Sequence, residues 1–202
     1  MRISKEPSVR ITEILDTAEG LFYAQGYGET SVRDIVTSMG VAQGTFYNYF
    51  TSKEAVAEAI ADRHLAKIYD QIEDIADSVR IPPNKMEMVV YSIFNGLRKN
   101  DGWMFDFLAD GHMYLLDKFI RLAQVRFAPL FKKIIDEGNQ SGYFTVSHPD
   151  EVLDYISAVL TCICHSLYKN LSADQLKRRL GIAERMINAA LRVEKERLHL
   201  MI

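Results

Sequence analysis

The chain has 202 residues, of which 48% are hydrophobic and 25% charged, as in a soluble globular protein, and this length allows a small domain joined to a larger one. No apolar run approaches the length of a membrane span and the first residues hold no hydrophobic signal region, which excludes a membrane or secreted protein and predicts a cytoplasmic one. The formal net charge of −3 argues against a protein that coats nucleic acid without regard to its sequence.

Residues 8–25 predict an amphipathic helix, with a loose arm before it at residues 1–7. Gly26 suits the left-handed backbone that ends such a helix, and Tyr27 is placed to fold back on Phe22. The apolar stripe recurs at spacings of three and four and consists of Ile11, Ile14, Leu15, Ala18, Leu21 and Phe22.

The stretch from Thr30 to Lys53 predicts two short helices around a tight turn. Ser31 can cap the free N–H groups of the first helix, and Asp34, three residues later, completes a capping box. Gly40 then supplies a residue that takes positive φ without a Cβ clash. The stretch therefore has the layout of a helix-turn-helix.

The second of these helices, expected from Ala42 to about Phe50, buries Phe46 and Phe50, four residues apart. Glutamine and asparagine bond base edges in the major groove, a threonine methyl touches thymine, and tyrosine hydroxyls reach phosphates. An ordinary hairpin with a tyrosine-rich solvent face is the alternative. The side chains left facing outward or sideways are polar and uncharged: Gln43, Gly44, Thr45, Tyr47, Asn48 and Tyr49.

This segment resembles the helix-turn-helix of the tetracycline-repressor (TetR) family of bacterial transcriptional regulators. The resemblance is detailed over about residues 8–60. It implies an all-α fold in which residues 1–52 form a three-helix DNA-binding domain and residues 53–202 a larger effector-binding and dimerisation domain. The residues that carry it are Thr30-Ser31, Asp34-Ile35, Met39-Gly40-Val41, Gly44-Thr45-Phe46-Tyr47, Tyr49-Phe50 and Ser52-Lys53-Glu54.

The expected DNA contacts divide into two groups. Four side chains are expected on bases or their flanking sugars, and Gly44 lets the backbone approach the DNA closely. Val32 cannot make a polar base contact, so fewer bases are expected to be contacted from the first helix. The base group is Gln43, Thr45, Tyr47 and Asn48, and the phosphate group is Thr30, Ser31, Tyr49 and Lys53.

The remaining sequence predicts further helices and no strand. A period near 3.6 from Lys53 to Arg80 predicts one long rod, stopped by Pro82-Pro83. Pro129 predicts either a kink or a break with a new first turn. Gly138 and Gly142 are expected to end the helix that holds Pro129. The later helices are expected at about residues 86–99, 103–110, 112–139, 150–169 and 172–195.

The last two helices predict a homodimer. Tyr155 to Tyr168 holds no charged residue, so this helix must be covered on more than one side. We infer that the segments at about 150–169 and 172–195 meet their symmetry mates as a four-helix bundle, and the resemblance implies the same pairing.

The resemblance implies an effector pocket in the aromatic-rich middle helices, at about residues 83–170. Dense packing with no cavity is the alternative for each single aromatic residue. Asp106 and Asp110 would favour a cationic ligand if they point inward. The candidate lining residues are Tyr91, Phe94, Trp103, Phe107, His112, Phe119 and His165.

These features favour a ligand-responsive transcriptional regulator, and in particular a repressor that binds a palindromic operator as a dimer and is released by a small-molecule effector. A helical protein-interaction module that uses the Tyr47/Tyr49 face is the alternative. An enzyme is not expected, because no Glu-x-x-His, His-Glu-x-x-His or glycine-rich phosphate loop occurs. No cofactor or metal is expected, since Cys162 and Cys164 point apart on a helix and are interpreted as core thiols.

Overall fold

The computed structural model describes residues 6–96, 113–169, 171–193 and 195–201, and within these ranges every regular element is a helix, which confirms the all-α prediction. Residues 1–5 of the predicted arm and the predicted aromatic helix at 103–110 lie outside the described residues. The helices are α1 (Pro7–Gln25), α2 (Val32–Ser38), α3 (Gln43–Tyr47), α4 (Lys53–Asp77), α5 (Pro82–Gly96), α7 (Met113–Ser141), α8 (Pro149–Tyr168) and α9 (Ala173–Leu191).

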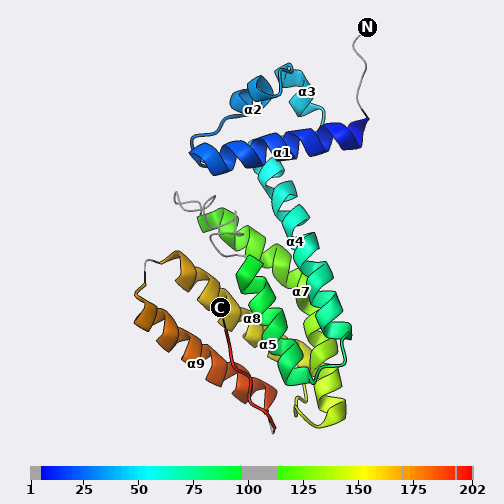
Figure 1. Cartoon of the computed structure of the whole chain (residues 1–202), viewed down its shortest axis with the longest axis vertical. Coiled ribbons are helices and arrows are strands. Elements are labelled where there is room, and N and C mark those ends of the chain that lie inside the picture. Colours follow the sequence, from blue (N-terminus) through cyan, green and yellow to red (C-terminus); the bar gives the residue numbers. More distant parts are fainter. Residues whose placement is uncertain (1–5, 97–112, 170, 194, 202) are drawn as a thin grey trace.

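The molecule consists of a small head, made of α1, α2 and α3, and a larger body, made of α4, α5, α7, α8 and α9 (Figure 1). Helix α4 starts beneath the head and runs along the body. It therefore packs both on α1 of the head and on α5 and α7 of the body. In the body, α5 and α7 pack on α4, α8 packs on α7, and α9 packs on α8. A single continuous helix therefore connects the head to the far end of the body.

Helix α4 ends at Asp77, three residues before the predicted Arg80. Ser78 leaves the helix with an extended ψ of 166°, and its hydroxyl donates to the carbonyl of Ile75 at 2.7 Å. The prolines therefore do not stop the rod as predicted. Pro82 begins α5, because proline fits the first turn of a helix, where its missing N–H would have no helical acceptor.

Helix α7 continues through Pro129 as one 29-residue helix, so the predicted alternative of a break is wrong. It ends just before Gly142, which adopts a φ of +72°. Gly138 lies inside the helix and does not end it. The ring of Phe144 packs directly on Gly138, where a Cβ atom would collide with it, and this close approach allows the chain to fold back against α7.

A buried lysine joins three helices at the end of the body that lies away from the head. The Lys85 side chain is only 3% exposed, and its Nζ donates to the carbonyl of Ala76 at 2.9 Å and to Oε2 of Glu137 at 2.6 Å. An ammonium so deeply buried requires partners of this kind. The contacts fix the end of α4 against α5 and α7.

Candidate DNA-binding face and effector cavity

Helix α2 begins with the predicted capping box. The Ser31 hydroxyl accepts from the Asp34 amide at 3.2 Å, while Asp34 Oδ2 accepts from the Ser31 amide at 2.8 Å. The hydroxyl and amide of Ser31 hold the pKa of the Asp34 carboxyl below its usual range. After α2, Gly40 takes a φ of +65°, as predicted for the turn. These contacts fix the direction in which the chain enters α3.

Helix α3 is anchored by Phe46, which is 0% exposed and packs edge-on against the Tyr47 ring at 5.4 Å between centroids. The helix spans Gln43–Tyr47, which is shorter than predicted, although the Phe50 amide still donates to the Phe46 carbonyl at 3.0 Å. Thr45 and Tyr49 are half-buried. The exposed residues of the predicted base-contacting face are Gln43, Gly44, Tyr47 and Asn48.

Two of the predicted phosphate contacts point inward. Thr30 is 1% exposed, and its hydroxyl donates to the Gly26 carbonyl at 2.7 Å. The Lys53 ammonium donates to the carbonyls of Tyr27 at 2.5 Å and Thr30 at 2.6 Å and lies 4.1 Å from the centroid of the Tyr27 ring. Burial lowers the pKa of this ammonium. Lys53 therefore holds the loop between α1 and α2 to the start of α4, and Thr30 braces the loop itself.

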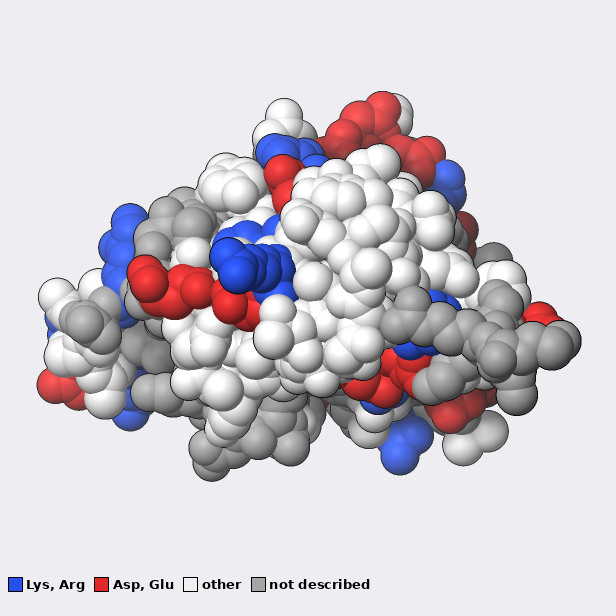
Figure 2. Space-filling model, turned by 90° about the horizontal axis from the view of Figure 1, so that it is seen from above, with Lys and Arg blue, Asp and Glu red and all other residues white. Residues whose placement is uncertain are grey.

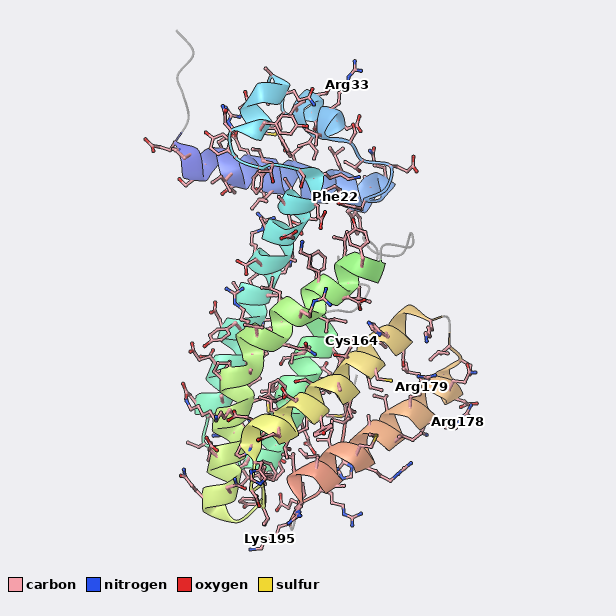
Figure 3. All side chains as sticks on the ribbon, turned by 180° about the vertical axis from the view of Figure 1, so that it is seen from behind. Phe22, Arg33, Cys164, Arg178, Arg179 and Lys195 are labelled. Carbon is pink, nitrogen blue, oxygen red and sulfur yellow. The ribbon has the colours of Figure 1, made fainter. Side chains whose placement is uncertain are left out.

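The end of the molecule that carries the head is largely uncharged in its middle, with separate groups of basic and acidic side chains around it (Figure 2). Arg33, an exposed residue of α2 that the sequence reasoning did not select, points away from the body (Figure 3). Arg10, by contrast, is paired with Glu13 at 2.7 Å. Arg33 could have been predicted as a phosphate contact from the sequence, because it lies on the solvent side of the helix that precedes the turn.

The head is fastened to α4 by a cluster of charged side chains. Arg63 Nη1 lies 2.6 Å from Asp16 Oδ1 and also pairs with Glu19, while His64 Nε2 lies 2.5 Å from Glu19 Oε1. Burial opposes ionisation of Glu19, but the hydrogen bonds and charges of His64 and Arg63 together lower its pKa. The orientation of α1 is thereby tied to the first half of α4.

Helix α7 also contacts the head. Tyr114, in the first turn of α7, forms a hydrogen bond with Tyr27, which lies just after α1, and burial together with this contact raises the pKa of Tyr27. One turn later, Lys118 donates to Glu54 at 3.1 Å and also pairs with Glu58, both on α4. A movement of α4 relative to α7 would therefore strain the contacts of Lys118 with α4.

A cavity of about 70 Å³ lies in the body between α4, α5, α7 and α8. None of the described residues that line it is charged. Its polar side chains include Gln124 and Thr161: Gln124 Nε2 donates to Thr161 Oγ1 at 2.9 Å, and Thr161 Oγ1 donates to the Ser157 carbonyl at 2.8 Å. The apolar walls include Leu65 and Ile68 from α4, Phe119, Phe127 and Phe131 from α7, and Leu153 and Leu160 from α8.

The structure places the predicted pocket residues in different surroundings. Phe119 lines the cavity, whereas Phe94 is buried but not among the lining residues. Tyr91 is 41% exposed, and His165 Nε2 lies 2.9 Å from Asp117 Oδ1 rather than in the wall. The sequence reasoning also missed the aliphatic walls, which carry no signal beyond core periodicity. The positions outside the described residues are Trp103, Asp106, Phe107, Asp110 and His112.

The two cysteines lie in different surroundings. Cys164 is buried in the cavity wall, and burial raises the pKa of its thiol to about 12. Cys162 is exposed, so its prediction as a core thiol is wrong for this chain by itself.

Among the described residues, no group of three or more metal-ligating side chains is close enough to hold a metal ion. Within the same ranges, no helix is both long and apolar enough to span a membrane.

A surface groove runs between α8 and α9. Its wall includes Tyr155, Ile182 and Met186, which are 73%, 49% and 53% exposed. Arg178 and Arg179, labelled on α9 in Figure 3, also line it, and Arg179 Nη1 donates to Ser166 Oγ at 3.1 Å. Large apolar side chains in such numbers on a surface typically mark an interface.

A capped helix-turn-helix on a helical body with an apolar cavity is the architecture of a DNA-binding regulator. Residues 14–60 match the family model described as bacterial regulatory proteins, tetR family. The chain is 24% identical to the HTH-type transcriptional repressor KstR2 of Mycobacterium tuberculosis over 166 residues, which cover 77% of this chain and 78% of that protein. Residues 14–60 therefore match the tetR family of bacterial regulatory proteins, and over most of its length the chain is similar to a helix-turn-helix transcriptional repressor.

Solved structures show the same fold. A TetR-family regulator from Pectobacterium atrosepticum superposes with a TM-score of 0.78 at 15% identity, covering 96% of this chain and 100% of that one. The regulator RolR in complex with resorcinol superposes with a TM-score of 0.70 at 14% identity, covering 93% and 89% of the two chains. These similar proteins are regulators rather than enzymes.

Proposed function

We propose that this protein is a cytoplasmic repressor that binds a palindromic operator as a homodimer and leaves it when a small molecule enters the cavity of the body. The observation that carries the proposal is the placement of α4. Lys53 at its start is bonded to the head, and Leu65 and Ile68 further along line the cavity. Leu65 lies about 18 Å from Lys53 along the helix, at ~1.5 Å per residue.

Direct contact with bases is assigned to uncharged side chains of α3 and to Asn48, which directly follows it. Gln43, Thr45, Tyr47 and Asn48 supply the donors, acceptors and methyl group that base edges bind in the major groove. Gly44 allows close approach of the backbone to the DNA.

Phosphate contacts are assigned to Ser31, Tyr49 and the exposed cation Arg33. Thr30 and Lys53 act differently from the sequence prediction, because their polar atoms are bonded inside the head. Their role is to hold α2 and α3 in position, and Lys53 adds its positive charge to the head.

Dimerisation is assigned to α8 and α9. The exposed apolar side chains of the groove would be covered by the same surface of a second chain, as in an isologous interface. Two copies of α3 would then be held at a fixed separation, which is what a palindromic site requires.

The effector acts through the shape of the body. The cavity of about 70 Å³ is smaller than an aromatic ring needs, since an apolar cavity of about 150 Å³ holds benzene. A larger effector would therefore favour a state in which α4 is displaced from α7 and α8. Because the head is bonded to α4, that state would have its two recognition helices at a different separation and a lower affinity for the operator. The repressor named among the similar proteins supports this direction of regulation.

The proposal is tested by selecting binding sites from a random DNA library with the purified full chain. The expected result is an enriched palindrome whose half-sites are about one helical turn apart or a small multiple of it. Gln43→Ala should relax the preference at one base pair of each half-site, whereas Gln71→Ala, on the exposed surface of α4, should leave the selected sequence unchanged.

A library from which no sequence is enriched would overturn the proposal. If a protein partner instead binds the chain and the Tyr47→Ala variant loses it, the face of α3 serves protein interaction.

A further inference from the structure

We propose that the cavity binds an uncharged molecule with a hydrocarbon body and one hydrogen-bond donor, and that this donor bonds to Oε1 of Gln124. The inference rests on the proposed function, because it names the chemical class of the effector. It is carried by the composition of the cavity wall and by the direction of its one side-chain-to-side-chain hydrogen bond among the described residues.

The described part of the wall offers no counter-charge to a charged ligand. Among the described residues that line the cavity, none is a lysine, arginine, aspartate or glutamate. The nearby thiol of Cys164 remains neutral, because burial raises its pKa to about 12. A carboxylate or an ammonium that entered this site would lose its hydration without gaining a counter-charge, and such a loss is far more costly than the burial of a neutral polar group.

The polar pair in the wall presents an acceptor to the ligand. Thr161 lies on α8, and its hydroxyl donates to the carbonyl four residues earlier, at Ser157, as threonine commonly does in a helix. The hydroxyl oxygen therefore offers a lone pair to α7, and Gln124 meets it with its Nε2. This fixes the orientation of the Gln124 amide, and its Oε1 has no donor recorded among the described residues. A ligand hydroxyl or amide N–H fits that oxygen, whereas an ether or ketone does not.

The remaining walls are apolar and favour a ligand with a hydrocarbon surface. Three phenylalanine rings of α7 and aliphatic side chains of α4 and α8 face the same space. Burial of an apolar ligand surface there is favourable roughly in proportion to its area, at ~25 cal/mol per Å². A ring-sized ligand would have to widen the space, and the α4 side chains Leu65 and Ile68 form the wall on the side that continues toward the head.

The test uses three probes of nearly equal shape: 4-methylphenol, which has a donor, 4-methylanisole, which has only an acceptor, and 4-methylbenzoate, which is charged. Binding to the full chain is measured by isothermal titration calorimetry. The phenol is expected to bind about 2- to 10-fold more tightly than the anisole, the range that one net hydrogen bond gives. The benzoate is expected not to bind.

The assignment to Gln124 is tested with Gln124→Met, which keeps the side-chain length and removes the amide. This variant is expected to bind the phenol and the anisole equally. Gln140→Met, an exposed glutamine on the same helix, is the matched control and should keep the preference for the phenol. Ala123→Phe, which fills the cavity from its wall, should abolish binding of both probes while thermal unfolding confirms that the variant folds.

The results separate the two proposals. Tighter binding of the benzoate than of the phenol, failure of all three probes to bind, or an unchanged preference in Gln124→Met would overturn the chemical class. If the phenol binds through Gln124 but leaves operator affinity unchanged, the class stands and the effector role of the cavity fails. If an anionic compound releases the operator from a chain that ignores the phenol, the repressor function stands and the class fails.

Discussion

The head and the body of this protein differ in how far their binding surfaces are formed before a ligand arrives. In the head, Phe46 is buried in the core and Thr30 donates to the Gly26 carbonyl, while Lys53 of α4 donates to the carbonyls of Tyr27 and Thr30. The body instead contains a space of about 70 Å³ lined mainly by apolar side chains.

This difference indicates how the two sites are expected to select their ligands. A rigid surface binds DNA through the fixed positions of its donors and acceptors, and it loses little entropy on binding. An apolar space bounded by four helices has no such fixed pattern, so it selects by polarity and size and can respond by shifting its helices. Specificity for DNA is therefore expected to depend on single side chains, and specificity for the effector on the wall as a whole.

The largest effect is expected for the anchor of α3. Phe46→Ala removes a fully buried ring from the head and should lower the free energy of unfolding by about 3–5 kcal/mol. Urea denaturation measures this loss. The matched variant Tyr47→Ala truncates a half-exposed ring that packs on Phe46, and it should lower stability by only about 0.5–1.5 kcal/mol while still impairing operator binding. Equal losses of stability in both variants would contradict the division between anchor and contact face.

The joint between head and α4 predicts a dependence on pH. Glu19→Gln should cost about 1.5–3 kcal/mol at pH 7, since it removes hydrogen bonds between charged groups. The folded-state pKa of Glu19 is lowered, so its contribution is fully present above the unfolded pKa of about 4.3 and is lost as pH falls through the folded value.

The difference in unfolding free energy between the wild type and Glu19→Gln should therefore shrink as the pH falls below about 4. Asp70→Asn, which changes an exposed carboxylate of α4, is the control and should show a difference near zero throughout. A Glu19→Gln difference that grows as the solution becomes more acidic would show that the cluster does not stabilise the ionised carboxylate.

The two capping boxes allow head and body to be compared with the same substitution. Ser31→Ala removes the N-cap of α2, and Ser172→Ala removes the N-cap of α9. In each capping box the side chain three residues later, Asp34 or Gln175, accepts from the backbone amide of the serine. Each should lower the free energy of unfolding by about 1 kcal/mol. Only Ser31→Ala should also weaken DNA binding in a titration. A weakening of similar size in Ser172→Ala would mean that the effect is one of general stability.

The smallest effect is expected for a single surface cation. Arg33→Ala should leave the free energy of unfolding within about 0.5 kcal/mol of the wild type. It should reduce the slope of log binding constant against log salt concentration by about 0.9, the value for one phosphate contact on duplex DNA. Arg10→Ala, whose guanidinium is already paired with Glu13, should change this slope less. The reverse order of slopes would move the phosphate contacts from α2 to α1.

The sequence predicted the head far better than the cavity. The capping box of Ser31 and Asp34 and the positive φ of Gly40 depend on residues next to each other in the chain, and the structure confirms both. The end of α4 was missed by three residues because the Ser78 hydroxyl bonds the last turn, a local competition that hydrophobic periodicity does not register.

The cavity could not be predicted because it arises where four helices from distant parts of the chain leave a space unfilled. Phe94 and Phe119 have the same periodicity in the sequence, yet only Phe119 lines the space. The burial of Thr30 and the inward turn of Lys53 depend in the same way on how α1 crosses α4. Contacts over such separations follow from packing, which a single sequence does not specify by inspection.

The central claim is that the chain recognises a DNA sequence as a dimer through α3, and a titration of the selected palindrome tests it most directly. Purified protein is added to the labelled site at two salt concentrations with an excess of random DNA. The proposed function predicts saturation at two chains per site or a multiple of two, weaker binding at higher salt, and little loss to the competitor. Binding that the random DNA abolishes, or saturation at one chain per site, would contradict the claim.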